Sequence, residues 1–372
     1  MAKDAIFVEQ FRLGDDGPTV AVKDCIDIAG WPTRAGSEAL AEQPPATRHA
    51  DVVEAILAAG GQIVGKTNMH ELAYGVTGVN RWLGTPLNSR YPDLIPGGSS
   101  SGSAAAVAAG LADIAIGTDT GGTIRMPATC CGVFGLKPSF GRVSRRGCTP
   151  ESSSLDCVGP FARDVAGLET GMTLIDPSFR IEPAPAAVRL GWIGSDADPE
   201  IVDAVLEALQ RPGVDLVDVE LDGMQEAFQA GIVIMAAEMW ALFGTLAEDP
   251  RMGADVQARI RAAAEVGPDR VAAAEKVREQ FRARVDAVLE HVDALVLPTL
   301  PATPPRLDDL GDAGRMLRLT SLVRPFNLSG HPSLSIPIDG LDGPPVAIQL
   351  VGASMGDERL CAVAHRVAGD AL

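Results

Sequence analysis

The sequence predicts an α/β domain with a partly parallel sheet. Apolar segments with the character of strands and of helices alternate along the chain, which is typical of this class. Apolar residues make up 46% of the 372 residues, enough to bury a core of that size. Gly and Pro separate the apolar segments without any linker-like or collagen-like period.

The first third of the chain supplies the clearest strands and helices. Short apolar runs predict strands, and Ala-rich runs followed by glycine predict helices. The predicted strands are 19–22, 62–65 and 114–116, and the predicted helices are 51–59, capped by Gly60 and Gly61, and 103–111.

The segment from about 200 to 290 differs, because its apolar residues recur every three or four positions. We expect helices at 201–209 and 271–291, and we expect this helical excursion to line the substrate pocket. Met235, Met239 and Trp240 are candidate pocket residues, although their spacing fits a core equally well. Strands are predicted at 294–297, stopped by Pro298, and at 327–338 and 346–352.

Composition narrows the function classes. A net charge of −18 disfavours binding to the phosphate backbone of nucleic acids and to anionic membranes. The first 14 residues lack the pattern of a signal peptide, and apolar runs such as 104–109 and 232–237 are too short to span a bilayer. Six cysteines form no CxxC pair and no metal-type spacing with histidine. We therefore expect a cytoplasmic protein with reduced thiols, no metal and no cofactor.

Residues 96–103, which read PGGSSSGS, lead directly into the Ala-rich segment 104–109. A flexible linker would have this composition, but the run is short and is followed directly by the helix-forming segment 104–109. A glycine loop at a helix N-terminus holds backbone N–H groups and hydroxyls in a fixed array. A phosphate loop would also need a following Gly-Lys-Ser/Thr, which is missing.

Residues 117–128 read GTDTGGTIRMPA. The Gly121-Gly122 pair permits a tight turn that points several N–H groups at one spot, as an oxyanion hole requires. Thr123 follows with a hydroxyl. Asp119 and Arg125 bracket the turn with opposite charges and could pair to hold it rigid. Taken alone, the segment also fits an ordinary turn between a strand and a helix.

Together, residues 96–138 resemble the amidase signature, the Gly/Ser-rich block of a large family of Ser–Ser–Lys amide hydrolases. Blocks 20–24, 65–69, 84–88, 325–330 and 346–352 resemble the same family in the same order. The resemblance covers most of the chain except about 180–290. It implies one amidase-type domain over 1–372, with a signature core at about 60–165 and a large mixed β-sheet covered by helices on both faces. The short segment before Lys23 resembles the compact branch that contains indole-3-acetamide hydrolase and malonamidase-type enzymes.

The resemblance also implies catalytic roles. Lys23 corresponds to the base, Ser99 to the bridging serine on a cis peptide bond, and Ser100 to a supporting hydroxyl. Thr123 stands where the family has the nucleophilic serine. Threonine has the same hydroxyl, and its extra methyl stiffens χ1 and crowds the attack trajectory.

The implied oxyanion hole consists of the backbone N–H groups of Thr120, Gly121, Gly122 and Thr123, with Asp119 and Arg125 in support. A catalytic histidine of a Ser–His–Asp hydrolase would need a nucleophilic serine in a Gly-x-Ser-x-Gly motif, which neither His70 nor His331 has nearby. The histidines are therefore all interpreted as structural or surface residues; they are at positions 49, 70, 291, 331 and 365.

The leading hypothesis is hydrolysis of a small carboxylic amide through an acyl-enzyme, by a protein that binds no nucleic acid or membrane and could form a homodimer. One alternative is the amide-transfer subunit of a tRNA-dependent amidotransferase, which shares the signature but needs partner subunits. Another is a catalytically silent binding module, because threonine replaces the expected serine.

Overall fold

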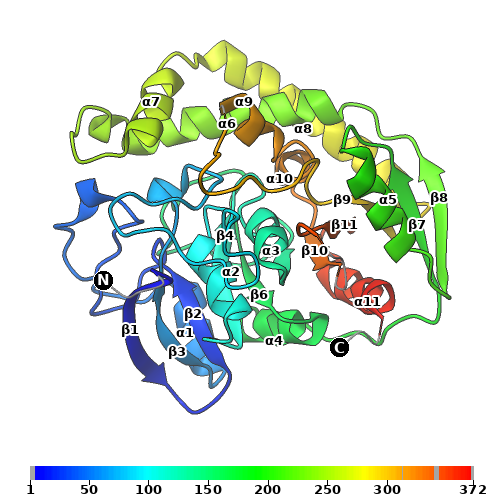
Figure 1. Cartoon of the computed structure of the whole chain (residues 1–372), viewed down its shortest axis with the longest axis horizontal. Helices are drawn as coiled ribbons and strands as arrows, with labels where there is room; N and C mark the ends of the chain where they lie inside the picture. Colours follow the sequence, from blue (N-terminus) through cyan, green and yellow to red (C-terminus); the bar gives the residue numbers. More distant parts are fainter. Residues whose placement is uncertain (1–4, 312, 339–342, 370–372) are drawn as a thin grey trace.

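An eleven-stranded mixed sheet runs through the computed structural model, which describes residues 5–311, 313–338 and 343–369 (Figure 1). The strand order is β1-β3-β2-β4-β6-β5-β10-β11-β9-β7-β8. β2 pairs in parallel with β3 and β4, as does β7 with β8 and β9, and the other pairs are antiparallel. The strands are β1 (Phe7–Gly14), β2 (Thr19–Lys23), β3 (Gln62–Thr67), β4 (Ile114–Asp119), β5 (Phe134–Lys137), β6 (Cys157–Ala162), β7 (Val188–Ile193), β8 (Val214–Val219), β9 (Ala294–Pro298), β10 (Ser333–Pro337) and β11 (Ala347–Val351).

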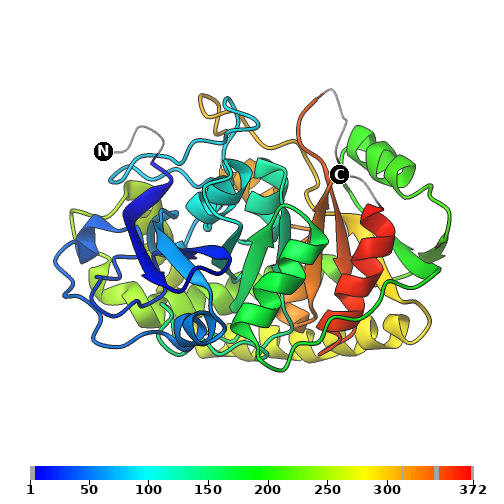
Figure 2. The same cartoon turned by 90° about the horizontal axis from the view of Figure 1, so that it is seen from below.

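Helices cover both faces of this sheet. On one face α1, α4 and α11 pack together, and Figure 2 shows α4 and α11 in front of the strands. On the other face α2 and α3 lie against the strands, and α6, α8 and α10 form a further layer. The helices are α1 (Asp51–Ala58), α2 (Ser101–Ala108), α3 (Arg125–Cys131), α4 (Val165–Ile175), α5 (Pro199–Ala208), α6 (Met224–Phe243), α7 (Ala254–Ala263), α8 (Pro268–Leu289), α9 (Ala313–Arg318), α10 (Arg324–Ser329) and α11 (Asp357–Ala368). The predicted fold class is confirmed.

Alternation along the central strands explains why both faces carry helices. In β4, Ile114 and Ile116 enter the core cluster of the α1 and α4 face, whereas Ala115 enters the α2 cluster. Successive strand residues point to opposite faces, so a strand that is apolar at every position must be covered on both. By the same alternation Lys23, two residues after Ala21, faces α2.

The predicted elements differ from the structure in several places. The predicted strand 327–338 is α10 followed by β10, since Pro325 lies in the first helical turn and Gly330 caps the end with φ +81°. The excursion 200–290 contains the strand β8 as well as helices. β6 was not predicted, because Gly159 and Pro160 interrupt its apolar pattern.

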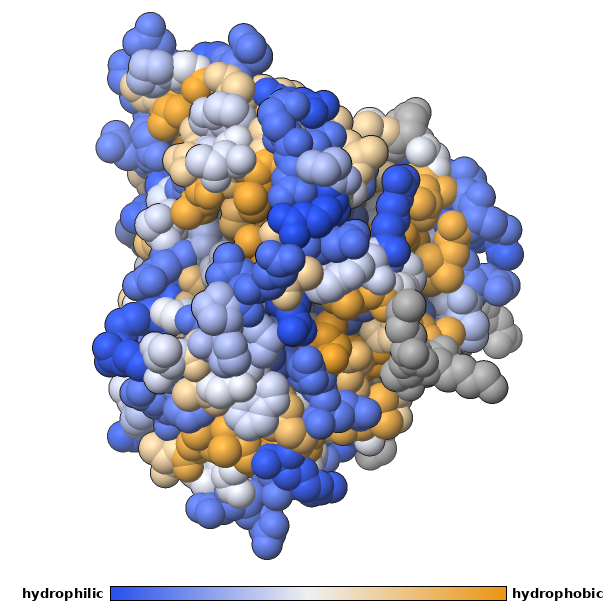
Figure 3. Space-filling view, turned by 90° about the vertical axis from the view of Figure 1, so that its left-hand side faces the viewer, coloured by the Kyte–Doolittle hydropathy of each residue, from blue (hydrophilic) through white to orange (hydrophobic). Residues whose placement is uncertain are grey.

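The apolar run 232–237 belongs to a longer helix than the sequence suggests. The segment Met224–Leu246 is long and apolar enough to cross a membrane by length and composition alone. A core helix of a folded domain passes the same test, and α6 packs against α7, α8 and α10. The side of the molecule at the left of Figure 1 carries separate hydrophobic patches among hydrophilic residues, as folded surfaces normally do (Figure 3).

Candidate active site

A buried lysine and a buried serine meet where β2 and α2 approach each other. Lys23 ends β2 with its side chain fully buried, and its Nζ donates to Ser99 Oγ at 2.8 Å and to Thr118 Oγ1 at 2.7 Å. Burial lowers the pKa of Lys23, an effect that the charges of Asp156 and Asp119 partly oppose. Because desolvation favours the neutral amine, this lysine can accept a proton.

The segment before α2 fixes the two serines in different ways. The Gly98–Ser99 peptide bond is cis, and the Ser99 carbonyl accepts a hydrogen bond from the His70 N–H at 3.0 Å. Ser100 instead braces β4, since its Oγ donates to the Thr118 carbonyl at 3.1 Å and accepts from the Thr118 N–H at 3.3 Å. Ser99 is therefore the serine in contact with the lysine, and Ser100 supports the neighbouring strand.

Asp119 organises the glycine turn that follows β4. Its carboxylate accepts hydrogen bonds from the N–H groups of Gly122 at 2.7 Å and Ile124 at 3.1 Å. Gly122 has φ +102°, a conformation that side chains rarely adopt. The Arg125 Nε lies 3.0 Å from the same carboxylate, and both side chains are fully buried. The predicted pairing of Asp119 and Arg125 is thus present in the structure.

Residues from the C-terminal third hold this ion pair in place. The Arg125 guanidinium donates to the Val323 carbonyl at 2.8 Å, to Gln349 Oε1 at 2.7 Å and to Asn327 Oδ1 at 2.6 Å. The Asn327 amide also donates to the Asp119 carboxylate at 2.8 Å. Sequence reasoning assigned no role to Asn327 or Gln349, although both lie in blocks that carried the family resemblance.

Thr123 lies close to this group without joining the lysine–serine pair. Its hydroxyl donates to the Thr118 carbonyl at 2.8 Å and accepts from the Thr120 N–H at 3.3 Å. Within the described part of the chain, no hydrogen bond links Thr123 to Ser99. The Gly122 N–H donates to Asp119. Among the four predicted oxyanion donors, the N–H groups of Gly121 and Thr123 have no hydrogen-bond acceptor within the described residues.

A cavity of about 1080 Å³ opens beside the turn and is lined by Thr120, Gly121 and Thr123. Parts of α6 and α7 and the loops around them form other walls, together with Arg324. Of the candidate pocket residues, Met235 lines this cavity, Met239 is buried in the core and Trp240 is 39% exposed on the surface.

The histidines occupy varied places. His70 is buried and lines the cavity, with Nε2 3.4 Å from Asp255, whereas sequence reasoning gave it no place near the site. His331 is also buried, between Ser329 and Asp286. Over the described ranges, no group of three or more His, Cys, Asp or Glu residues is arranged to hold a metal ion.

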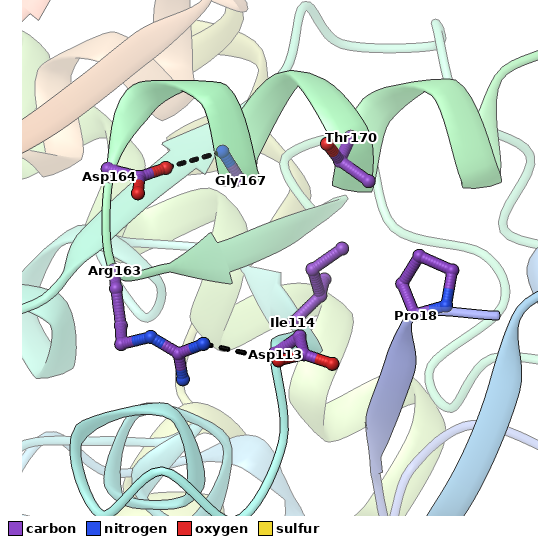
Figure 4. A pocket seen from close by; sticks show the side chains of 7 residues that line it. All are labelled: Pro18, Asp113, Ile114, Arg163, Asp164, Gly167 and Thr170. Carbon is purple, nitrogen blue, oxygen red and sulfur yellow. Dashed lines mark hydrogen bonds and ion pairs between the residues drawn. The ribbon is translucent and has the colours of Figure 1, made fainter.

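A second, smaller cavity of about 280 Å³ lies between β4 and α4 (Figure 4). Its charged groups are satisfied by each other and by the backbone. Arg163 pairs with Asp113 at 3.2 Å, and Asp164 accepts from the Gly167 N–H at 2.6 Å. This cavity therefore offers a ligand few free polar groups.

Comparison with known families identifies the chain. The Amidase family model matches residues 16–179 and 187–361. The chain belongs to the amidase family. It is accordingly an amide-cleaving enzyme by family, as the signature predicted, and its fold agrees with solved amidase structures.

Similar amidase-family proteins extend over nearly the whole chain. The A subunit of glutamyl-tRNA(Gln) amidotransferase from Halobacterium salinarum is 35% identical, covering 95% of both chains. The corresponding A subunit from Thermotoga maritima has a solved structure with a TM-score of 0.84 and 27% identity, covering 98% of this chain and 88% of that one. An inhibitor-bound chain from a vestigial protein complex, described as revealing the origins of an s-triazine catabolic enzyme, has a TM-score of 0.86 and 32% identity, covering 94% and 83%.

These comparisons confirm the family resemblance and overturn another expectation. Curated relatives such as the Halobacterium salinarum protein are named as amidotransferase A subunits rather than as indole-3-acetamide hydrolase or malonamidase-type enzymes. The expectation of an enzyme without nucleic acid, acting alone or as a homodimer, is wrong. The relatives are named as subunits of an amidotransferase for glutamyl-tRNA, and a structural neighbour comes from a protein complex. Net charge describes this chain alone and therefore says nothing about subunits with which such relatives assemble.

Proposed function

We propose that this amidase cleaves a carboxylic amide and releases ammonia as the amide-transfer subunit of a tRNA-dependent amidotransferase. An amidotransferase needs a nitrogen donor, and a chain of an amide-cleaving family can supply it. The 35% identity to an amidotransferase A subunit over 95% of both chains supports this assignment. The two sequences also correspond in length, since the match covers 95% of each. Six buried cysteines, none in a disulfide within the described residues, agree with a cytoplasmic location.

The proposed chemistry is acyl transfer through Thr123. The Thr123 hydroxyl attacks the amide carbonyl and its proton passes to Ser99, whose own proton passes to Lys23. The N–H groups of Gly121 and Thr123 stabilise the oxyanion. The amine leaves as it takes up a proton, and water then hydrolyses the threonyl ester to release the carboxylate. The hydrogen bond from Lys23 to Ser99 at 2.8 Å, fully buried, is the observation that carries this mechanism.

The Thr123 hydroxyl must turn before it can react. Its proton is directed at the Thr118 carbonyl, so a rotation about χ1 is needed to hand that proton to Ser99. A β-branched side chain has few χ1 rotamers, and the threonine methyl must fit the cavity wall after the turn. This resting arrangement also favours a second candidate, a family member that has lost catalysis and serves as a binding module.

Variants at position 123 test the proposal. Thr123→Ala should be inactive, whereas Thr123→Ser should match or exceed the wild type, because serine keeps the oxygen and rotates more freely. The readouts are ammonia release from a panel of primary amides and intact mass after incubation, where an acyl adduct should map to residue 123. Continued turnover by Thr123→Ala would mean that another group attacks. An inert wild type with an active Thr123→Ser variant would identify the silent binding module.

The partner assignment needs a separate experiment. The tagged chain, expressed at its native level in its own cells, should co-purify with the other subunits of an amidotransferase, and ammonia release should rise when they are present. Recovery of the chain alone, with full activity on a free amide, would instead identify a stand-alone hydrolase of small amides.

A further inference from the structure

Asp156 is a buried carboxylate that lies beside the glycine turn and does not line the cavity. It is 1% exposed and stands directly before β6, whose first residue pairs with the last residue of β4. The Thr120 hydroxyl donates to its Oδ1 at 2.9 Å, and the Arg145 Nε donates to its Oδ2 at 3.1 Å. The proposed reaction passes no proton through Asp156, so the mechanism leaves this carboxylate without a role.

The loop before β6 holds Arg145 in place, which gives Asp156 a fixed support. The Arg145 guanidinium donates to the carbonyl groups of this loop at Pro150, Glu151 and Ser153. The loop is in turn tied to α6, because Glu238 accepts hydrogen bonds from the Ser153 hydroxyl at 2.7 Å and from the Ser154 N–H at 2.8 Å. A carboxylate that is paired with such an arginine can hold a hydroxyl in one position on its other side.

Thr120 connects Asp156 to the reacting groups. Its hydroxyl donates to Asp156, while its backbone N–H donates to Thr123 Oγ1 at 3.3 Å. Because a β-branched side chain has few χ1 rotamers, the hydrogen bond to Asp156 also restrains the backbone of Thr120. When the Thr123 hydroxyl turns toward Ser99, the Thr120 N–H loses its acceptor. It is then available to the oxyanion together with the N–H groups of Gly121 and Thr123.

We propose that Asp156 is a positioning residue that acts through Thr120, by holding the Thr120 N–H first on the Thr123 hydroxyl and then on the oxyanion. A displacement of about 1 Å can slow a reaction ~10²-fold, so a carboxylate that touches no substrate can still determine the rate. This inference rests on the proposed function, which places the reaction at this turn.

The charge of Asp156 gives the proposal a pH signature. Burial lowers the pKa of Lys23, and a nearby carboxylate opposes this effect because it favours the protonated amine. The titratable groups whose charges interact with that of Lys23 are Cys25, Asp156, Asp119, Cys148 and His70. Asp156→Asn removes one of these charges and should lower the pKa of Lys23 further. The rising limb of the activity profile should therefore move to lower pH.

Variants at position 120 test the contact with Asp156. Thr120→Val keeps the shape of the side chain and loses the hydroxyl, so kcat for ammonia release should fall roughly 10- to 10²-fold at nearly constant KM. Its pH profile should stay in place, because the carboxylate remains. Thr120→Ser keeps the hydroxyl and should retain most of the rate.

Asp176→Asn is the matched control. Asp176 is also buried and also accepts from an arginine and a hydroxyl, those of Arg142 and Ser178, but it follows α4 on the face of the sheet opposite Lys23. This variant should lower the melting temperature and leave both kcat and the pH profile unchanged.

Amide hydrogen exchange at residue 120, followed by NMR, measures the positioning without turnover. Relative to the intrinsic rate, exchange should be faster in Thr120→Val than in the wild type by roughly 2- to 10-fold, the range for one hydrogen bond. It should be unchanged in Asp176→Asn. Wild-type kcat and wild-type exchange in Thr120→Val, or a pH profile that Asp156→Asn leaves in place, would overturn the proposal. Faster exchange in Thr120→Val of a protein that cleaves no amide would leave the positioning standing and refute the proposed function.

Discussion

Replacing Asp119 by Asn tests whether the buried ion pair supports the glycine turn that follows β4. The amide keeps the size of the carboxylate but loses its charge, which leaves the Arg125 guanidinium buried without a counter-ion. Breaking a buried pair in this way typically costs about 3–5 kcal/mol. We expect the lower end, about 3 kcal/mol, because the asparagine oxygen can still accept from a backbone N–H of the turn. With about 2.1 cal/mol/K of unfolding entropy per residue, this corresponds to a melting temperature lower by roughly 4 °C in a chain of 372 residues.

Circular dichroism melting at pH 7 measures the loss of stability. Ammonia release measures whether the altered turn still supports amide cleavage. Glu248→Gln is the matched control, since Glu248 pairs with Arg261 on the surface and such pairs contribute at most about 1 kcal/mol. If the variant at 119 melted no lower than this control, the ion pair would not hold the turn.

The difference in stability between wild type and the Asp119→Asn variant should also depend on pH. Burial alone would raise the pKa of Asp119, but the charge and hydrogen bonds of Arg125 outweigh it and hold the pKa below its usual range. A carboxyl group whose pKa is lowered on folding adds stability above its unfolded pKa and loses it as pH falls through the folded value. The gap in stability between wild type and variant should therefore persist in mild acid and close only well below pH 4.

Three further outcomes are expected. Lys23→Ala should abolish amide cleavage in a folded protein. Wild-type activity should rise with pH through a pKa below the usual lysine value, because burial lowers the pKa of Lys23 and the neutral amine is the active form. A flat pH profile would remove the lysine from the mechanism. Ser99→Ala should be severely impaired and Ser100→Ala less so, as only Ser99 contacts the lysine, and steady-state kinetics with the order reversed would exchange their roles. Exhaustive EDTA treatment should leave ammonia release unchanged, whereas a loss restored by added metal would reveal a metal requirement.

The sequence indicated which residues would lie near one another in the candidate site because these residues belong to short motifs, while their catalytic roles stay predictions. Lys23 ends an apolar strand, and the two glycine-rich segments begin and end recognisable elements. The parallel pairing of β2 with β4 then brings Lys23 beside the end of the strand that leads into the turn. Local patterns therefore predicted the elements, and the sheet register determined which side chains met.

Arg324 could not be predicted in the same way. Its position depends on α10 packing against α6, and no local pattern fixes that contact between distant parts of the chain. Reading 327–338 as one strand hid the short helix, although Pro325 and Gly330 are the usual signals for its first turn and its end. Partners of the kind proposed could not be predicted either, because net charge describes the chain alone.

The hydrogen bonds from Arg125 to the C-terminal third have a consequence for the protein while it is being synthesised. Its acceptors at Val323, Asn327 and Gln349 lie 198, 202 and 224 residues further along the chain. A ribosome delivers the glycine turn first and these acceptors only after 198 to 224 further residues. An unfinished polypeptide therefore holds its lysine, serine and threonine but lacks the braced turn. Amide cleavage should begin only after these acceptors have been synthesised, so a polypeptide interrupted before them would be inert rather than an unregulated source of ammonia.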